Sequence, residues 1–155
     1  MTTRKPKTAL LDKEVMEVEV SVNLWRATRR LDAIFAPIFA THGISNAQFN
    51  VLRILYVREG DHGVPCNEIS QRLIHRIPDV TRLLDRLLRD GLIERQRCPL
   101  DRRVVRSRLT EKGQALMEDI YPVIMATHRE AVSALSDDEQ RELNRLLLQL
   151  NQQRK

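Results

Sequence analysis

The sequence predicts a mainly α-helical fold with one small β-hairpin. Three observations support this. Apolar side chains recur every three or four residues over most of the chain, capping residues and glycines divide these stretches, and strand-like alternation appears only between residues 92 and 109. With 155 residues, 42% of them apolar and 30% charged, the chain has the composition of one ordered globular domain.

A first long helix is predicted between the basic N-terminal segment and Gly43. Residues 1–11 are expected to form a flexible tail. Pro37 should kink the helix or mark a break in it, because proline removes a backbone donor. Its apolar positions at helical spacing are Val15, Val18, Val22, Trp25, Leu31, Ile34, Phe35, Ile38 and Phe39.

The next helix is predicted to begin at Ser45. Ser45 and Gln48 have the spacing of a capping box, in which each side chain satisfies a backbone N–H of the other residue. The apolar pattern then continues to about Arg58. Residues 59–63 are rich in turn-forming side chains, so the helix should end there.

Two further helices should follow, a short one from about Asn67 to Ile74 and a longer one over residues 78–90. Pro78 suits the first turn of the second helix, and Gly91 suits its C-terminal stop. The inward positions expected in that helix are Val80, Leu83, Leu84, Leu87 and Leu88.

After Gly91 the spacing changes to that of strands. Residues 92–97 and 104–109 flank a short arginine-bearing segment, Cys98-Pro-Leu-Asp-Arg-Arg103, which predicts a two-stranded hairpin. Thr110 then caps a long helix in which Pro122 is a possible bend. Ser136 and Glu139 form a second capping box and open a last helix rich in leucine.

The positive charge of the chain is concentrated in its centre. Residues 72–108 hold 11 arginines, no lysine and 5 acidic residues, a net charge of +6, whereas residues 1–71 carry +1 and residues 109–155 carry −2. A local excess of this kind is typical of a surface that meets a polyanion. The alternative is a solvated helix face beside a charged hairpin.

The order helix, short helix, tight turn, helix and arginine-tipped hairpin is that of a winged helix-turn-helix. Asp79, Arg82, Arg86 and Arg89 share one face of the helix 78–90, at spacings that suit a major groove. Arg82 lies near the N-terminus, where a forked guanidinium can bind guanine. Arg86 and Arg89 lie further along and are expected to reach phosphates, which add affinity without sequence information. Thr81 completes the expected DNA-contacting set on this helix.

The hairpin tip is the second expected contact. A narrow, A·T-rich minor groove attracts an inserted guanidinium, and Arg102 and Arg103 project from this loop. Asp101 would repel DNA unless it pairs with one of these arginines and leaves the other free to enter the groove.

Several segments together resemble one known family. They are Asn67-Glu-Ile-Ser-Gln-Arg-Leu73, Pro78-Asp-Val-Thr-Arg-Leu-Leu-Asp-Arg-Leu87, Gly91-Leu-Ile-Glu-Arg95, Asp101-Arg-Arg103 and Leu109-Thr-Glu-Lys-Gly113. The sequence resembles the MarR family from about residue 12 to its end, and the hairpin segment is most similar to the SlyA branch.

The resemblance implies obligate dimers with intertwined terminal helices that bind pseudo-palindromic operators. It also implies that Arg82 reads the major groove, that Arg102 enters the minor groove and that Asp101 orients Arg103. Many members are repressors released by small phenolic or aromatic ligands. Asp79 departs from the Ser or Asn common in relatives. An acid there would repel phosphate or accept from a cytosine amino group, so base preference does not transfer.

A homodimer is also expected from the residues themselves. The terminal helices, at about residues 12–42 and 111–153, are too long and too apolar for the winged module at about residues 45–110 to bury. The alternative is packing against the chain's own core.

Between these helices and the winged module, a ligand cavity could be lined by Trp25, Phe39, His42 and Phe49, although aromatic residues at helical spacing are more often plain core.

Other site chemistries have little support. The histidines lack metal-ligand spacing, and no phosphate-binding loop or nucleophile motif occurs, so we expect neither a metal, a cofactor nor an enzyme. Cys98 is a candidate redox switch because arginines surround it in sequence. Two cysteines, no membrane-spanning apolar run and no signal-like start favour a cytoplasmic protein.

The sequence thus predicts a homodimeric, sequence-specific transcriptional regulator, a repressor responsive to a small aromatic ligand, formed by one domain over residues 12–155. One alternative is an architectural protein that binds DNA without sequence specificity. Another is a dimeric interaction module that has lost DNA binding, against which the presence of Arg82, Arg102 and Arg103 argues.

Overall fold

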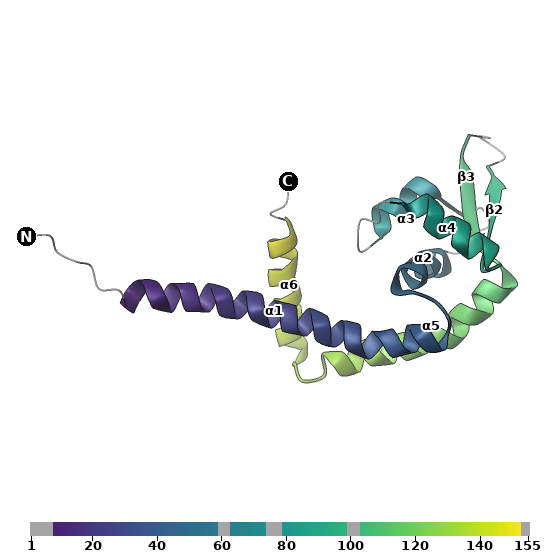
Figure 1. The fold of residues 1–155 in the computed structure, drawn as a ribbon. Coiled ribbons are helices and arrows are strands. Elements are labelled where there is room, and N and C mark those ends of the chain that lie inside the picture. The colour runs from purple at the N-terminus through teal and green to yellow at the C-terminus, as the bar shows by residue number, and fades with distance from the viewer. Residues whose placement is uncertain (1–7, 59–62, 74–78, 99–102, 153–155) are drawn as a thin grey trace, which may run out of the picture. The chain divides into compact units, whose positions relative to one another are not determined.

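The computed structural model describes residues 8–58, 63–73, 79–98 and 103–152, with side chains from Val15 onward. Residues 1–35 and 36–155 form two units, and each is described by itself. The chain is mostly helical with one small antiparallel sheet, as the sequence predicts (Figure 1).

Helix α1 (Thr8–Thr41) runs without a break through Pro37, so the predicted break is wrong. A long helix tolerates the loss of one internal hydrogen bond, since the other backbone bonds of the helix remain. Residues 8–11, assigned above to a flexible tail, belong to the helix. Gly43 follows with a φ of +65°, which completes the predicted stop.

Helix α2 (Asn46–Val57) begins with the predicted capping box. The Gln48 backbone N–H donates to Ser45 Oγ at 3.1 Å, and the Ser45 backbone N–H donates to Gln48 Oε1 at 2.9 Å. The helix then buries most of its apolar side chains, which makes it the centre of the second unit.

Helices α3 (Cys66–Arg72) and α4 (Val80–Arg89) form the predicted helical pair. Helix α4 starts at Val80 rather than at Pro78, which lies outside the described residues, and Gly91 ends it with a φ of +69°. Its inward face is as predicted with one exception. Leu88 is exposed, because the last turn of α4 buries only Leu87.

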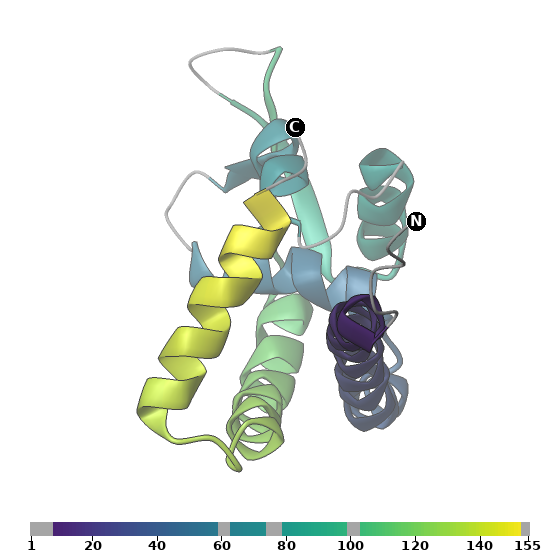
Figure 2. The ribbon, with the colours of Figure 1, turned by 90° about the vertical axis from the view of Figure 1, so that its left-hand side faces the viewer.

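The sheet has three strands in the order β1-β3-β2, all antiparallel. Strands β2 (Ile93–Arg97) and β3 (Val105–Leu109) form the predicted hairpin, which projects from the helices in both views (Figures 1 and 2). Strand β1 (Val64–Pro65) was not predicted, because two residues are too few to show an alternating pattern.

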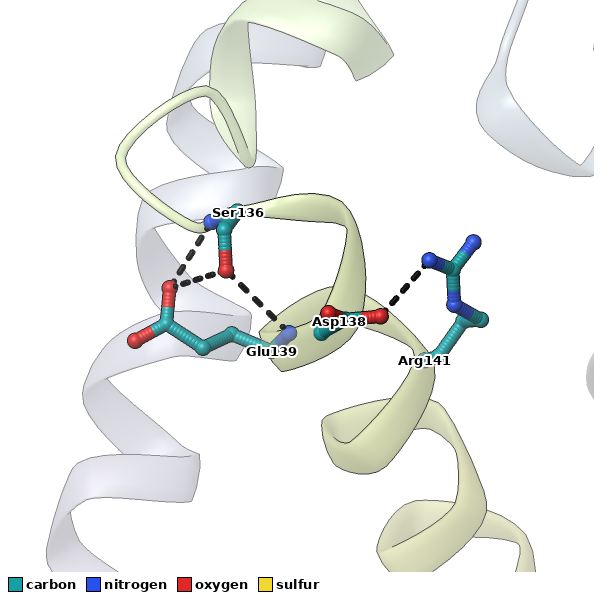
Figure 3. A network of polar contacts seen from close by, with 4 residues as sticks. All are labelled: Ser136, Asp138, Glu139 and Arg141. Atoms are coloured by element: carbon teal, nitrogen blue, oxygen red, sulfur yellow. Dashed lines mark hydrogen bonds and ion pairs between the residues drawn. The ribbon is translucent and has the colours of Figure 1, made fainter.

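The chain ends in α5 (Glu111–Ala131) and α6 (Asp137–Gln152). Pro122 does not interrupt α5. Helix α6 begins with the second predicted capping box, in which the Ser136 backbone N–H and hydroxyl both donate to Glu139 Oε2 at 2.8 Å (Figure 3). Arg141 Nη2 donates to Asp138 Oδ1 at 2.7 Å near the start of this helix, and the same figure shows the pair.

One core holds the second unit together. It lies where α2, α4, the sheet and α5 meet, and it supports the outward face of α4. Its most deeply buried side chains are Val51, Leu52, Ile69, Leu84, Leu87, Ile93, Met117, Ile120 and Ile124.

Candidate nucleic-acid interface

Helix α4 has an apolar face and a polar face, with the exposed Leu88 as the one apolar exception among its described residues. Val80, Leu83, Leu84 and Leu87 face the core, whereas its arginines are exposed. A helix anchored in this way presents a row of guanidinium groups on a rigid support. The dimensions of an α-helix fit the major groove of B-form DNA, so the face carrying Thr81, Arg82, Arg86 and Arg89 can meet base edges and phosphates. All four side chains are exposed.

Asp79 is the N-cap of α4. Its Oδ1 accepts from the Arg82 backbone N–H at 2.9 Å, and its Oδ2 lies 2.8 Å from Arg82 Nε. The signal for this cap was present in the sequence, since aspartate is among the preferred N-cap residues. The sequence interpretation missed it because Pro78 was assigned to the helix.

Several of the described arginines in residues 72–108 have acidic partners and several do not. Among the described residues, four are paired with carboxylates: Arg72 with Glu68, Arg82 with Asp79, Arg95 with Asp85 and Arg108 with Glu94. Arg86, Arg89 and Arg97 are exposed and have no ion pair with any described residue. Among the described residues, α4 and the adjoining strand β2 therefore present exposed positive charge that no carboxylate compensates, on a surface that a polyanion could approach.

Polar contacts fix the hairpin to the rest of the module. Arg95 Nη1 on β2 donates to Asp85 Oδ1 on α4 at 2.8 Å, and Arg106 Nη1 on β3 donates to the Gly63 carbonyl at 3.0 Å. A β-carbon at Gly63 would lie 2.7 Å from the Ser107 carbonyl oxygen, so the sheet needs glycine there. The hairpin and α4 are thus held as one surface.

The hairpin tip is described only in part. Asp101 and Arg102 lie outside the described residues, whereas Arg103 is exposed where the chain returns to β3. The expected insertion of Arg102 and the expected pairing of Asp101 with Arg103 remain predictions.

The four candidate pocket residues lie in different surroundings. Phe39 and Phe49 are buried and pack with ring centroids 5.3 Å apart. His42 is half-buried; its Nδ1 lies 2.6 Å from the Ile38 carbonyl oxygen and its Nε2 lies 3.2 Å from Asp119 Oδ2 on α5. Trp25 is 72% exposed and belongs to the other unit. The structure thus brings Phe39 and Phe49 together as core residues.

Both cysteines are free thiols. Cys98 is buried at the end of β2, and its backbone N–H donates to the Val104 carbonyl at 2.8 Å. Cys66 is half-buried and opens α3. Where residues are described, no group of three or more His, Cys, Asp or Glu side chains could hold a metal ion. No described helix combines the length and apolar character needed to cross a bilayer.

The comparisons with known proteins match this architecture. The MarR family model matches residues 44–105, which span the helix pair and most of the hairpin. The HTH-type transcriptional regulator YkoM of Bacillus subtilis is 34% identical over 142 residues, covering 84% of this chain and 86% of YkoM. The chain belongs to the MarR family.

Solved structures of MarR-family proteins share the fold. A variant of MarR from E. coli in complex with operator DNA is 26% identical and has a TM-score of 0.73, covering 87% of this chain and 95% of MarR. BpsR of Bordetella bronchiseptica is also 26% identical, with a TM-score of 0.70, and the match covers 86% of this chain and 98% of BpsR. Its structure concerns regulation of DNA binding by 6-hydroxynicotinic acid.

Membership of the MarR family makes this chain a DNA-binding transcriptional regulator and not a protein of an enzyme family. The matches support the family as a whole. The assignment to the SlyA branch stays a prediction.

Proposed function

We propose that this MarR-family regulator is a homodimeric, sequence-specific repressor of the cytoplasm that binds a pseudo-palindromic operator and is released by a small aromatic ligand. The observation that carries the proposal is the outward face of α4. It presents Thr81, Arg82, Arg86 and Arg89 from a helix whose opposite face is fixed in the core. MarR of E. coli, whose fold this chain shares, was solved with operator DNA.

Each arginine has a separate role in this proposal. Arg82 lies in the first turn of α4, and its terminal nitrogens bind the O6 and N7 atoms of a guanine. Arg86 and Arg89 follow at one-turn intervals and bind phosphates, which set the orientation of the helix. The hairpin adds Arg102 in the minor groove beside the site, with Asp101 holding Arg103 in place.

The homodimer is supported by the exposure of α6. This 16-residue helix buries none of its side chains within the chain, although leucines recur along it. An apolar helix face left in water is costly, so a second copy that covers it would gain burial. The exposed large apolar side chains of α6 are Leu143, Leu146, Leu148 and Leu150.

The ligand is the part of the proposal that rests most on relatives. BpsR was solved in a study of its regulation by 6-hydroxynicotinic acid, an aromatic acid. In this chain the half-buried His42 links the end of α1 to Asp119 on α5. We expect the carboxyl group of an aromatic acid to displace Asp119 from His42 while the ring of the acid lies near Phe39 and Phe49. Such binding would disturb the junction between the terminal helices and the winged module.

A selection from randomised duplex DNA tests the proposal. The full chain should enrich a two-fold symmetric sequence whose half-sites lie about 10 base pairs apart, because a two-fold dimer sets its recognition helices one helical turn apart. Sedimentation should give the mass of a dimer. Aromatic acids added to the selected complex should lower its affinity. Enrichment of an unsymmetrical motif, or a monomer at micromolar concentration, would contradict the proposal.

An architectural DNA-binding protein is the second candidate. Arg86, Arg89 and Arg97, which are exposed and have no ion pair with a described residue, favour it, because phosphate contacts alone give binding without sequence preference. Under this alternative the selection would enrich no motif, although the protein would still bind duplex DNA in a salt-dependent way.

A further inference from the structure

We propose that Asp79 is a specificity-determining residue, which holds the Arg82 guanidinium by its Nε and so directs Arg82 to a guanine rather than to the phosphates. This inference rests on the proposed function, in which α4 meets the major groove. It concerns how the protein distinguishes one DNA sequence from another. Asp79 would act through Arg82, as a positioning residue, and would make no direct contact with a base.

The geometry gives each oxygen of the carboxylate a different task. Oδ1 accepts from the Arg82 backbone N–H at 2.9 Å, which fixes the carboxylate to the first turn of α4. Oδ2 lies 2.8 Å from Arg82 Nε, which fixes the guanidinium to the carboxylate. The side chain of Arg82 is therefore tied to the start of its own helix. Its freedom to swing toward the DNA backbone is reduced.

The part of Arg82 that is not held is the part that recognises guanine. A guanidinium has five N–H groups, and the pairing through Nε leaves the four on Nη1 and Nη2. No described residue bonds to these two nitrogens, and the Arg82 side chain is 82% exposed. The terminal fork matches the O6 and N7 acceptors of guanine in the major groove.

The charge of Asp79 also favours contact of Arg82 with a guanine over contact with a phosphate. Phosphate binding depends on net positive charge, and the Asp79 carboxylate compensates that of Arg82. Arg86 and Arg89, on the same face of α4, have no acidic partner among the described residues and keep their full attraction for phosphate. The pair is exposed and contributes little to folding, so its effect is expected in recognition.

The pairing also lowers the ordering cost of recognition. A long side chain loses rotamer freedom when it is immobilised at an interface. Arg82 has already lost part of this freedom in the unbound protein, so it binds a correctly placed guanine at a smaller entropic cost. At other bases the terminal donors lack a pair of acceptors, and the held side chain cannot easily turn to a phosphate. Both effects increase the difference in binding affinity between the operator and other DNA sequences.

The test compares Asp79→Ala, which loses both the helix cap and the charge, with two variants that keep the cap and lose only the charge, Asp79→Asn and Asp79→Ser. Both residues are good N-caps, so α4 should remain capped and circular dichroism should show unchanged folding. Asp90→Asn is the matched control. It removes one acidic charge at the other end of the same helix, where the Asp90 carboxylate accepts from Gln48 Nε2 at 3.3 Å, and leaves Arg82 paired.

Two measurements follow on the duplex that the wild-type full chain selects from randomised DNA. The first is the affinity for every single-base substitution of that duplex. The second is the affinity for one random-sequence duplex over a series of KCl concentrations. Relative to Asp90→Asn, both capped Asp79 variants should lose about tenfold in discrimination at one guanine of each half-site. Their salt slope should steepen by about one per subunit, as Arg82 gains a phosphate.

Three results would overturn the inference. The Asp79 variants could match Asp90→Asn in both measurements, which would make the pair irrelevant to recognition. They could lose preference at a cytosine instead, which would mean that Asp79 contacts a base directly. Asp79→Ala alone could be impaired, which would reduce the role of Asp79 to capping. A wild-type protein that selects no sequence would instead overturn the proposed function itself.

Discussion

Arg95 Nη1 on β2 donates to Asp85 Oδ1 on α4 at 2.8 Å, and this contact joins the hairpin to the helix that faces DNA in our proposal. Arg95 is 24% exposed at its side chain and Asp85 is 49% exposed. Partly exposed ion pairs contribute about 0.2–1 kcal/mol. A double-mutant cycle with Asp85→Ala and Arg95→Ala, followed by urea unfolding, should give a coupling free energy in that range. A coupling near zero would mean that this ion pair does not help to hold the hairpin against α4.

Replacement of Arg82 should affect specificity, whereas replacement of Arg86 should affect affinity alone. Arg82→Ala is expected to weaken binding to the selected duplex by about 1–3 kcal/mol and to relax base preference at one position of each half-site. Arg86→Ala should weaken binding to all duplexes alike and reduce the salt slope by about one per subunit. Fluorescence anisotropy on single-base variants of the duplex measures both. Equal loss of preference in the two variants would contradict the division of roles.

Loss of the α2 cap should destabilise the whole winged module. Ser45→Ala removes the oxygen that accepts from the Gln48 backbone N–H, at a cost of about 1 kcal/mol in the free energy of unfolding. Ser70→Ala, an exposed serine within α3, is the control and should change stability by less than about 0.5 kcal/mol. Urea unfolding compares the two. Equal effects would show that the capping box contributes nothing measurable.

His128 should make stability fall in mild acid. Its partial burial, and then the nearby Arg53 guanidinium, lower the pKa of His128 from its usual value. The unfolded chain therefore takes up a proton near pH 6.5 while the folded chain does not. The contribution of neutral His128 to the free energy of unfolding is thus complete above that pH. It is lost as the pH falls toward the folded-state pKa.

The His128→Gln variant should show a smaller loss of thermal stability between pH 7.5 and pH 5 than the wild type. His62→Gln, which changes a histidine in the segment 59–63, serves as the control for the removal of one titrating side chain. Parallel stability profiles for His128→Gln and the wild type would contradict the assigned cause.

Two helix starts were predictable because the side chains of a capping box bond backbone N–H groups within the same four residues, although the Asp79 cap of α4 was missed. Ser45 with Gln48 and Ser136 with Glu139 are four-residue signals, and both capping boxes form as predicted. Backbone φ angles of +65° at Gly43 and +69° at Gly91 are equally local, because other residues avoid this conformation. The alternation of β3 was visible because Ser107 and Leu109 face the core from a strand of five residues.

The features that could not be predicted from the sequence depend on tertiary context. Strand β1 has two residues, and it is a strand only because Val64 and Pro65 lie beside Ser107 and Arg106. Pro37 suggested a kink or a break, and the break is wrong because the rest of α1 outweighs one missing donor. At the candidate site, the periodicity of the sequence was enough to predict which side chains share the outer face of α4. The bond from Arg82 to Asp79 could be predicted only if the position of the first helical residue were known. Sequence alone placed that position two residues early.

The central claim is that the face of α4 recognises a particular DNA sequence, and a ratio of affinities tests it most directly. The dissociation constant of the full chain is measured at one fixed salt concentration for the selected duplex and for a random duplex of equal length. The account predicts that the selected duplex binds at least about 10³ times more tightly. A ratio near one would contradict it and would leave a protein that binds the DNA backbone alone.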